Sequence, residues 1–110
     1  MTFQVTSDKL VAVVLWKMKQ QNKDSATFQE IRDYGWKLQK QCNDAGVDVL
    51  IDRYSTIDAL SMCDMFYYVE INGVPYIKAN SRASPQKLFD MFCICLKDFV
   101  HIVKSTSLTT

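Results

Sequence analysis

The residue types that most often carry out chemistry are few in this chain and poorly spaced for it. His101 is the single histidine, so a nucleophile paired with a histidine base has one candidate base. The cysteines are Cys42, Cys63, Cys93 and Cys95. Cys93 and Cys95 are two apart on a predicted helix, about 200° around its axis, and cannot chelate one zinc ion together. We therefore expect no catalytic residues and no metal site.

One basic cluster could bind an anion. The glycines form neither a GxGxxG pattern nor a P-loop, so we expect no nucleotide cofactor. Lys78, Arg82 and Lys87 flank the start of the last predicted helix, whose free N–H groups and dipole favour negative charge. No acidic side chain lies between Ile71 and Phe89. The alternative interpretation is a solvated basic turn.

Two further hypotheses involve nucleic acids. In a metal-dependent nuclease two carboxylates hold the metal and a lysine steadies the attacking water, and Asp64 and Lys78 could supply part of such a site. Tyr76, however, occupies the place of the second carboxylate. Phosphate contacts could also come from lysines on the first two predicted helices, namely Lys17, Lys19, Lys23, Lys37 and Lys40. The alternative is that these lysines only form the solvent-exposed faces of two amphipathic helices.

The composition indicates one globular domain over 1–110. The chain is 48% hydrophobic and 12% aromatic, with 3 Gly and 2 Pro, which excludes a disordered or collagen-like chain. No apolar run reaches the roughly 18 residues that span a bilayer, and the start lacks the order of a signal peptide. We expect a cytoplasmic protein with reduced cysteines and no membrane partner. Net charge is +3 over 1–43, −5 over 44–70 and +3 over 71–110, a pattern that could pair between subunits.

Two helices are predicted in the first half of the chain. Residues 8–21 carry apolar side chains at helical spacing. After a polar turn over 22–26, Thr27 and Glu30 have the spacing of a capping box. An unbroken apolar stripe then predicts a second helix over 27–44.

Strands are predicted where the apolar period changes to two. The alternation predicts a strand over 47–52. Asn72-Gly73 between the β-rich runs 65–71 and 74–79 predicts a hairpin with a type I′ turn, because both turn residues need positive φ. That turn sets the facing pairs Ile71 with Val74, Val69 with Tyr76, and Tyr67 with Lys78. Both faces of the hairpin are largely apolar, so we expect both to be covered.

The last element is a long apolar helix. Ser84-Pro85 is a good helix start, and the pattern predicts a helix over 86–104 with a frayed tail over 105–110. Residues 54–64 favour a short helix, with an irregular crossing as the alternative. The expected order is thus α-α-β-(α)-β-β-α. The expected fold class is α+β, with a small antiparallel sheet of about three strands packed by the three longer helices.

The excess of apolar surface favours a partner. We expect a non-catalytic binding module that acts through protein–protein contact as a homodimer, since aromatic residues commonly anchor interfaces. Nucleic-acid binding is the second hypothesis and a nuclease-like enzyme the third. The expected interface residues lie on one face of the hairpin and on the last helix: Phe66, Tyr68, Ile77, Phe89, Phe92 and Phe99. Packing within one chain is the alternative role for the same aromatics.

Overall fold

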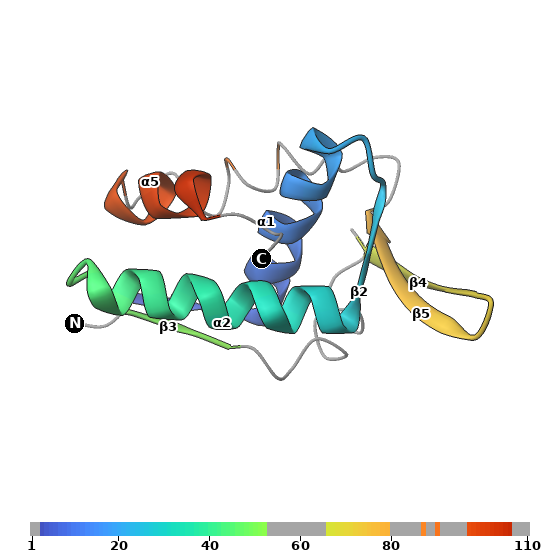
Figure 1. The fold of residues 1–110 in the computed structure, drawn as a ribbon, viewed down its shortest axis with the longest axis horizontal. Helices are drawn as coiled ribbons and strands as arrows, with labels where there is room; N and C mark the ends of the chain where they lie inside the picture. The colour runs from blue at the N-terminus through green and yellow to red at the C-terminus, as the bar shows by residue number, and fades with distance from the viewer. Residues whose placement is uncertain (1–2, 53–65, 80–86, 88–89, 91–96, 107–110) are drawn as a thin grey trace.

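The computed structural model describes residues 3–52, 66–79, 87, 90 and 97–106, and it is a small α+β fold (Figure 1). In chain order its elements are β1 (Phe3–Val5), α1 (Ser7–Gln20), β2 (Ser25–Thr27), α2 (Phe28–Asp44), β3 (Val49–Ile51), β4 (Phe66–Ile71), β5 (Val74–Ala79) and α5 (Lys97–Ser105). The predicted class and the predicted order of helices and hairpin are confirmed. The predicted short helix over 54–64 lies outside the described residues.

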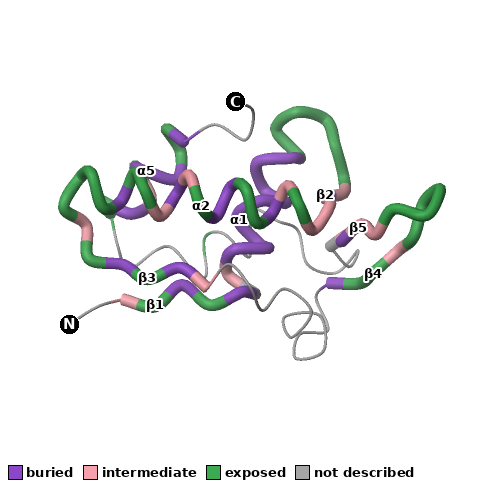
Figure 2. The backbone as a smooth tube through the Cα atoms, turned by 60° about the horizontal axis from the view of Figure 1, so that its bottom comes forward, coloured by how far each residue is buried: buried purple, intermediate pink, exposed green. Residues whose placement is uncertain are grey.

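Helix α1 is the centre of the molecule. Every residue from Leu10 to Met18 is buried, so this part of the helix is enclosed on all sides (Figure 2). It contacts α2, β2 and β5. A helix that is apolar around its whole circumference has to be buried, because water would otherwise meet apolar side chains on every face.

Helix α2 begins and ends where its sequence predicts. The Thr27 hydroxyl accepts a hydrogen bond from the Glu30 N–H at 3.0 Å, and the Glu30 carboxylate accepts one from the Thr27 N–H at 3.0 Å. This capping box satisfies two donors that a helix start otherwise leaves free. The buried face of the helix consists of Ile31, Tyr34, Gly35, Leu38 and Cys42.

The hairpin is confirmed, but its third strand is not the predicted one. The order of the antiparallel sheet is β2-β5-β4, and all of the predicted facing pairs are present. Asn72 and Gly73 have φ of 52° and 79°, as a type I′ turn requires. The third strand is β2, whose first residues fall in the segment predicted as a polar turn. Such a short segment carries no alternation of its own and becomes a strand only by pairing with β5.

The predicted strand over 47–52 forms a separate sheet instead. Residues Val49–Ile51 pair in parallel with Phe3–Val5, and this pair lies along the side of α2 away from the hairpin (Figure 1). The Gln39 side chain covers the outer edge of β3: its amide nitrogen donates to the Val49 carbonyl at 2.9 Å, and its amide oxygen accepts from the Ile51 N–H at 2.8 Å. One glutamine thus takes the place of a neighbouring strand for these peptide groups.

The C-terminal part packs against α2. Lys87, Asp90 and Lys97–Ser105 are helical, in agreement with the predicted last helix at these positions. The predicted frayed tail begins too early, because Thr106 is buried and its hydroxyl donates to the Ile102 carbonyl at 2.7 Å. Residues 107–110 lie outside the described residues. The folded part of the chain therefore extends beyond the predicted end of the helix. The cause is that Lys17 of α1 and Tyr34 of α2 donate hydrogen bonds to carbonyls at the end of α5.

Candidate functional site

The sheet β2-β5-β4 has one buried face and one exposed face. Side chains alternate between the faces of a strand, so the observed register puts Ala26, Phe66 and Ile77 on one face, and all three are buried. The other face carries Tyr67, Val69 and Ile71 of β4 and Val74, Tyr76 and Lys78 of β5. We name the apolar part of this face, Tyr67, Val69, Ile71, Val74 and Tyr76, the outer sheet surface.

The outer sheet surface is unusually exposed for its composition. Tyr67 is 45% exposed, Ile71 45% and Val74 41%, and Val69 and Tyr76 are half-buried. The cause is position: the hairpin projects beyond the described helices, so none of them lies above or below its tip (Figure 2). Even Tyr68, which shares the inner face, is 51% exposed, and its ring lies 6.3 Å from the ring of Phe28 at the start of α2.

A charged pair borders this surface. The Lys78 ammonium lies 3.4 Å from the Asp24 carboxylate, with 26% and 84% of the two side chains exposed. An ion pair this open to water stabilises a fold by at most about 1 kcal/mol. Its clearer effect is on recognition, because it places one positive and one negative group at the same end of an apolar face.

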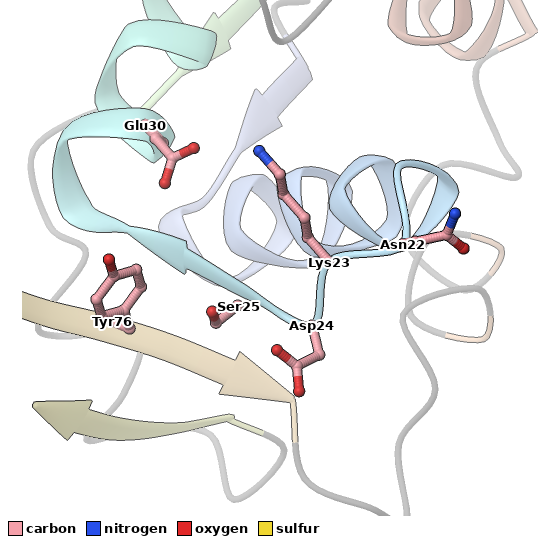
Figure 3. Close-up of a pocket in the computed structure, with 6 residues that line it drawn as sticks. All are labelled: Asn22, Lys23, Asp24, Ser25, Glu30 and Tyr76. Atoms are coloured by element: carbon pink, nitrogen blue, oxygen red, sulfur yellow. The ribbon is translucent and has the colours of Figure 1, made fainter. Parts of the chain in front are cut away.

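A polar hollow of about 400 Å³ continues the surface beyond Tyr76. Figure 3 shows its lining, which is Asn22, Lys23, Asp24, Ser25, Glu30 and Tyr76. Its acidic groups are already engaged, Asp24 with Lys78 and Glu30 with the Thr27 N–H. The hydroxyls of Ser25 and Tyr76 therefore add hydrogen-bonding groups beside the apolar face rather than an acid or base for catalysis.

The structure separates the predicted interface residues. Phe66, Ile77 and Phe99 are buried inside the chain, where they form part of its core. Tyr68 is exposed. Phe89 and Phe92 lie outside the described residues. The exposed residues of the outer sheet surface stand at alternating apolar positions in the sequence. The residues between them are largely apolar as well, so the pattern does not tell which face of the hairpin α1 covers.

Of the predicted anion cluster, Lys78 and Lys87 lie within the described residues. Lys78 pairs with Asp24, an acidic residue that lies far from it in the sequence, directly before β2. Lys87 is exposed, and Arg82 lies outside the described residues. Asp64, the proposed first carboxylate of a nuclease site, also lies outside them.

One predicted phosphate contact is instead an internal cap. The Lys17 side chain is buried, and its ammonium donates to the Lys104 carbonyl at 3.2 Å and to the Thr106 carbonyl at 2.6 Å. The Tyr34 hydroxyl donates to the Val103 carbonyl at 3.1 Å. Together they satisfy carbonyls that the end of α5 leaves free. Burial lowers the pKa of Lys17 below its ordinary 10.5, because desolvation disfavours the charged form.

The remaining chemistry-bearing residues do not gather. Cys42 is buried in the core, and burial raises the pKa of its thiol to about 11, which opposes thiolate chemistry. His101 is exposed on α5. Over the described part of the chain, no three His, Cys, Asp or Glu side chains lie together as a metal site would require. Nor does any helix in that part have the length and apolar character needed to cross a membrane.

Function has to be inferred from the exposure and the chemistry of the residues described above, because comparisons with known proteins give no match. No protein-family model, curated protein or solved structure matches this chain. Of the features described above, the outer sheet surface departs most from what folding alone requires. It is therefore the candidate functional site.

Proposed function

We propose that this protein is a non-catalytic protein-binding module that acts as a homodimer and contacts its protein target through the outer sheet surface. The observation that carries the proposal is the exposure of Tyr67, Ile71 and Val74 side by side on one face. Contiguous exposed apolar side chains are costly in water and typically mark interaction surfaces. Tyrosine suits such a surface, because its ring is buried on binding while its hydroxyl keeps a hydrogen bond.

The surroundings support a protein as the target. The Lys78–Asp24 pair and the hydroxyls of the hollow form a polar border next to an apolar centre, which is the usual layout of a protein interface. Neither sign of charge dominates this border. A nucleic-acid surface would instead carry an excess of basic groups, and here Lys78 is neutralised by Asp24 and Lys17 is buried.

The test compares two substitutions at exposed apolar positions. Ile71→Asp puts a charge on the outer sheet surface, and Leu50→Asp puts the same charge on β3, where Leu50 is 55% exposed. We expect both variants to keep the circular dichroism spectrum of the wild type. Proteins retained by the immobilised wild type and by Leu50→Asp should be lost from Ile71→Asp, as measured by quantitative mass spectrometry.

Two results would contradict the proposal. One is equal retention of the same proteins by all three forms, which would place binding elsewhere. The other is the loss of the same proteins from both variants, which would make the effect one of charge in general rather than of this surface.

A further inference from the structure

The free edge of β4 carries a predictable set of peptide groups. In the described sheet β4 lies at the edge, with β5 on its other side. In a hairpin with a two-residue turn, the residues that flank the turn exchange both hydrogen bonds, and this pattern recurs at every second pair. Tyr67, Val69 and Ile71 therefore bond to β5. The N–H and C=O groups of the alternate residues, Tyr68 and Glu70 among them, point away from the sheet.

Apart from Glu70, the β4 sequence carries none of the residues that commonly prevent a further strand from pairing at an edge. Natural edge strands commonly carry lysine, proline or a bulge, which prevent another strand from pairing. β4 reads Phe-Tyr-Tyr-Val-Glu-Ile, and it pairs with β5 over its whole length without an extra residue. Only Glu70 introduces a charge. The strand thus combines high β propensity, an open row of peptide groups and an exposed apolar face.

We infer that the second copy of the homodimer joins along this edge, with the two β4 strands antiparallel and Val69 on the two-fold axis. The inference rests on the proposed function and names how the subunits meet. Tyr68 and Glu70 of one copy exchange N–H···O=C bonds with Glu70 and Tyr68 of the other. The three-stranded sheet is thereby doubled, and the outer sheet surface continues across the junction.

The side chains select this register over its neighbours. A two-fold axis normal to the sheet can lie on Tyr68, Val69 or Glu70. With the axis on Glu70, two carboxylates face each other, and with the axis on Tyr68, each Glu70 faces an apolar Phe66. With the axis on Val69, Glu70 of each copy faces the Tyr68 ring of the other. On the outer face the two Val69 side chains face each other, and on either side of them Tyr67 of one copy faces Ile71 of the other. Like charges directly opposite are destabilising, whereas aromatic and β-branched pairs stabilise.

Cysteine pairing tests the register directly. Residues that face each other without hydrogen bonds lie about 4.5 Å apart at Cα, which is within the range of a disulfide. In a background with Cys63, Cys93 and Cys95 changed to serine, Val69→Cys should form an intermolecular disulfide under mild oxidation. Ile71→Cys alone should not, but a mixture of Tyr67→Cys and Ile71→Cys chains should. The parent background is the control, and peptide mass spectrometry identifies the linked residues.

A second pair of variants tests the edge hydrogen bonds. Tyr68 faces Ile77 at a position without hydrogen bonds to β5, so Tyr68→Pro removes an outward N–H and leaves the hairpin ladder intact. Tyr68→Ala removes the same side chain but keeps the N–H. We expect Tyr68→Pro to raise the dimer dissociation constant at least about tenfold relative to Tyr68→Ala, because the axis repeats the loss in both copies.

Light scattering separates failure of the edge from failure of the proposed function. Twice the 12.7 kDa chain mass together with the predicted disulfides supports the inference. A dimer in which Ile71→Cys links to itself, or Val69→Cys does not, overturns the edge pairing but leaves a homodimeric binding module. A monomer at about 0.1 mM, where even weak dimers form, overturns the edge pairing and the homodimer together. The target-binding comparison of Ile71→Asp with Leu50→Asp is then judged by itself.

Discussion

Replacing Gln39 by leucine should weaken the fold through two backbone groups rather than through lost packing. Phe3 N–H donates to the Asp48 carbonyl and Asp52 N–H to the Val5 carbonyl, so these peptide groups of the β3 segment face β1. The Val49 carbonyl and the Ile51 N–H face the opposite way and are both bonded by the Gln39 amide, at 2.9 and 2.8 Å. Leucine keeps the approximate volume but can neither donate nor accept. Both groups then lose their protein partner.

The expected magnitude follows from the two bonds. Each hydrogen bond contributes about 0.5–1.5 kcal/mol net, so the pair contributes about 1–3 kcal/mol. The side chain is half-buried, so water can partly replace it, and leucine adds a little apolar burial. We expect Gln39→Leu to lower the free energy of unfolding by about 1–2 kcal/mol. That corresponds to a fall in Tm of roughly 5–10 °C for a domain of this size.

Gln39→Glu adds a dependence on pH whose sign is fixed by the same geometry. A protonated glutamic acid can donate to the Val49 carbonyl and accept from the Ile51 N–H, whereas an ionised one faces that carbonyl with a negative charge. The folded pKa of this carboxyl should therefore be raised above its unfolded value of about 4.3. Its stabilising effect is present below that value and is lost as pH rises through the folded pKa. Gln39→Glu should thus approach the wild type at pH 4 and fall furthest behind it at pH 7.

Urea unfolding followed by circular dichroism measures these differences, and Gln41→Leu is the matched control. Gln41 lies on the same helix, two residues away, and its side chain is exposed. If Gln39→Leu unfolds within about 0.5 kcal/mol of Gln41→Leu, which is the usual spread of surface substitutions, the edge bonds contribute nothing net and the reasoning is refuted. A Gln39→Glu variant whose deficit does not change with pH would refute the assigned donor and acceptor roles.

The further predictions concern three buried residues. Lys17→Met should destabilise the fold, because the Lys104 and Thr106 carbonyls lose their donor. Since the pKa of Lys17 is lowered in the folded protein, the wild type should gain stability relative to Lys17→Met as pH rises towards 10.5. A difference between the two urea midpoints that is the same at pH 7 and at pH 10 would contradict this. Cys42 should resist alkylation in the native protein at pH 8 and react only on unfolding, because the side chain is buried and the pKa of its thiol is raised to about 11. The tryptic peptide over 41–53 contains no other cysteine, so its mass measures the labelling of Cys42. Rapid labelling of the native protein would contradict the prediction by showing that the thiol is accessible. The same raised pKa adds stability that is present below pH 9 and lost as pH rises towards 11, a loss that Cys42→Ala should lack. Ile77→Asp should unfold the chain, whereas Ile71→Asp six residues earlier should not, and a folded Ile77→Asp by circular dichroism would show that Ile77 is not core.

The sequence by itself determined the elements whose signals are local. The start of α2 follows from Thr27 and Glu30, because a capping box joins residues three apart. The hairpin and its register follow from Asn72-Gly73, since a two-residue turn with positive φ fixes which residues face each other. These interactions form within a few residues and need nothing from the rest of the chain.

Only the tertiary structure decided which faces are buried and what the isolated polar groups do. β2 and β1 are short and become strands by pairing with segments far along the chain. From the sequence, Lys17 is expected to be a solvent-exposed lysine on an amphipathic helix, but in the fold the end of α5 lies beside it and accepts its hydrogen bonds. Both faces of the hairpin are apolar, so the sequence leaves open whether Ile77 or Ile71 is core. Packing against α1 and α2 settles it, because a side chain's burial depends on which distant elements lie against it and not on its neighbours in the sequence.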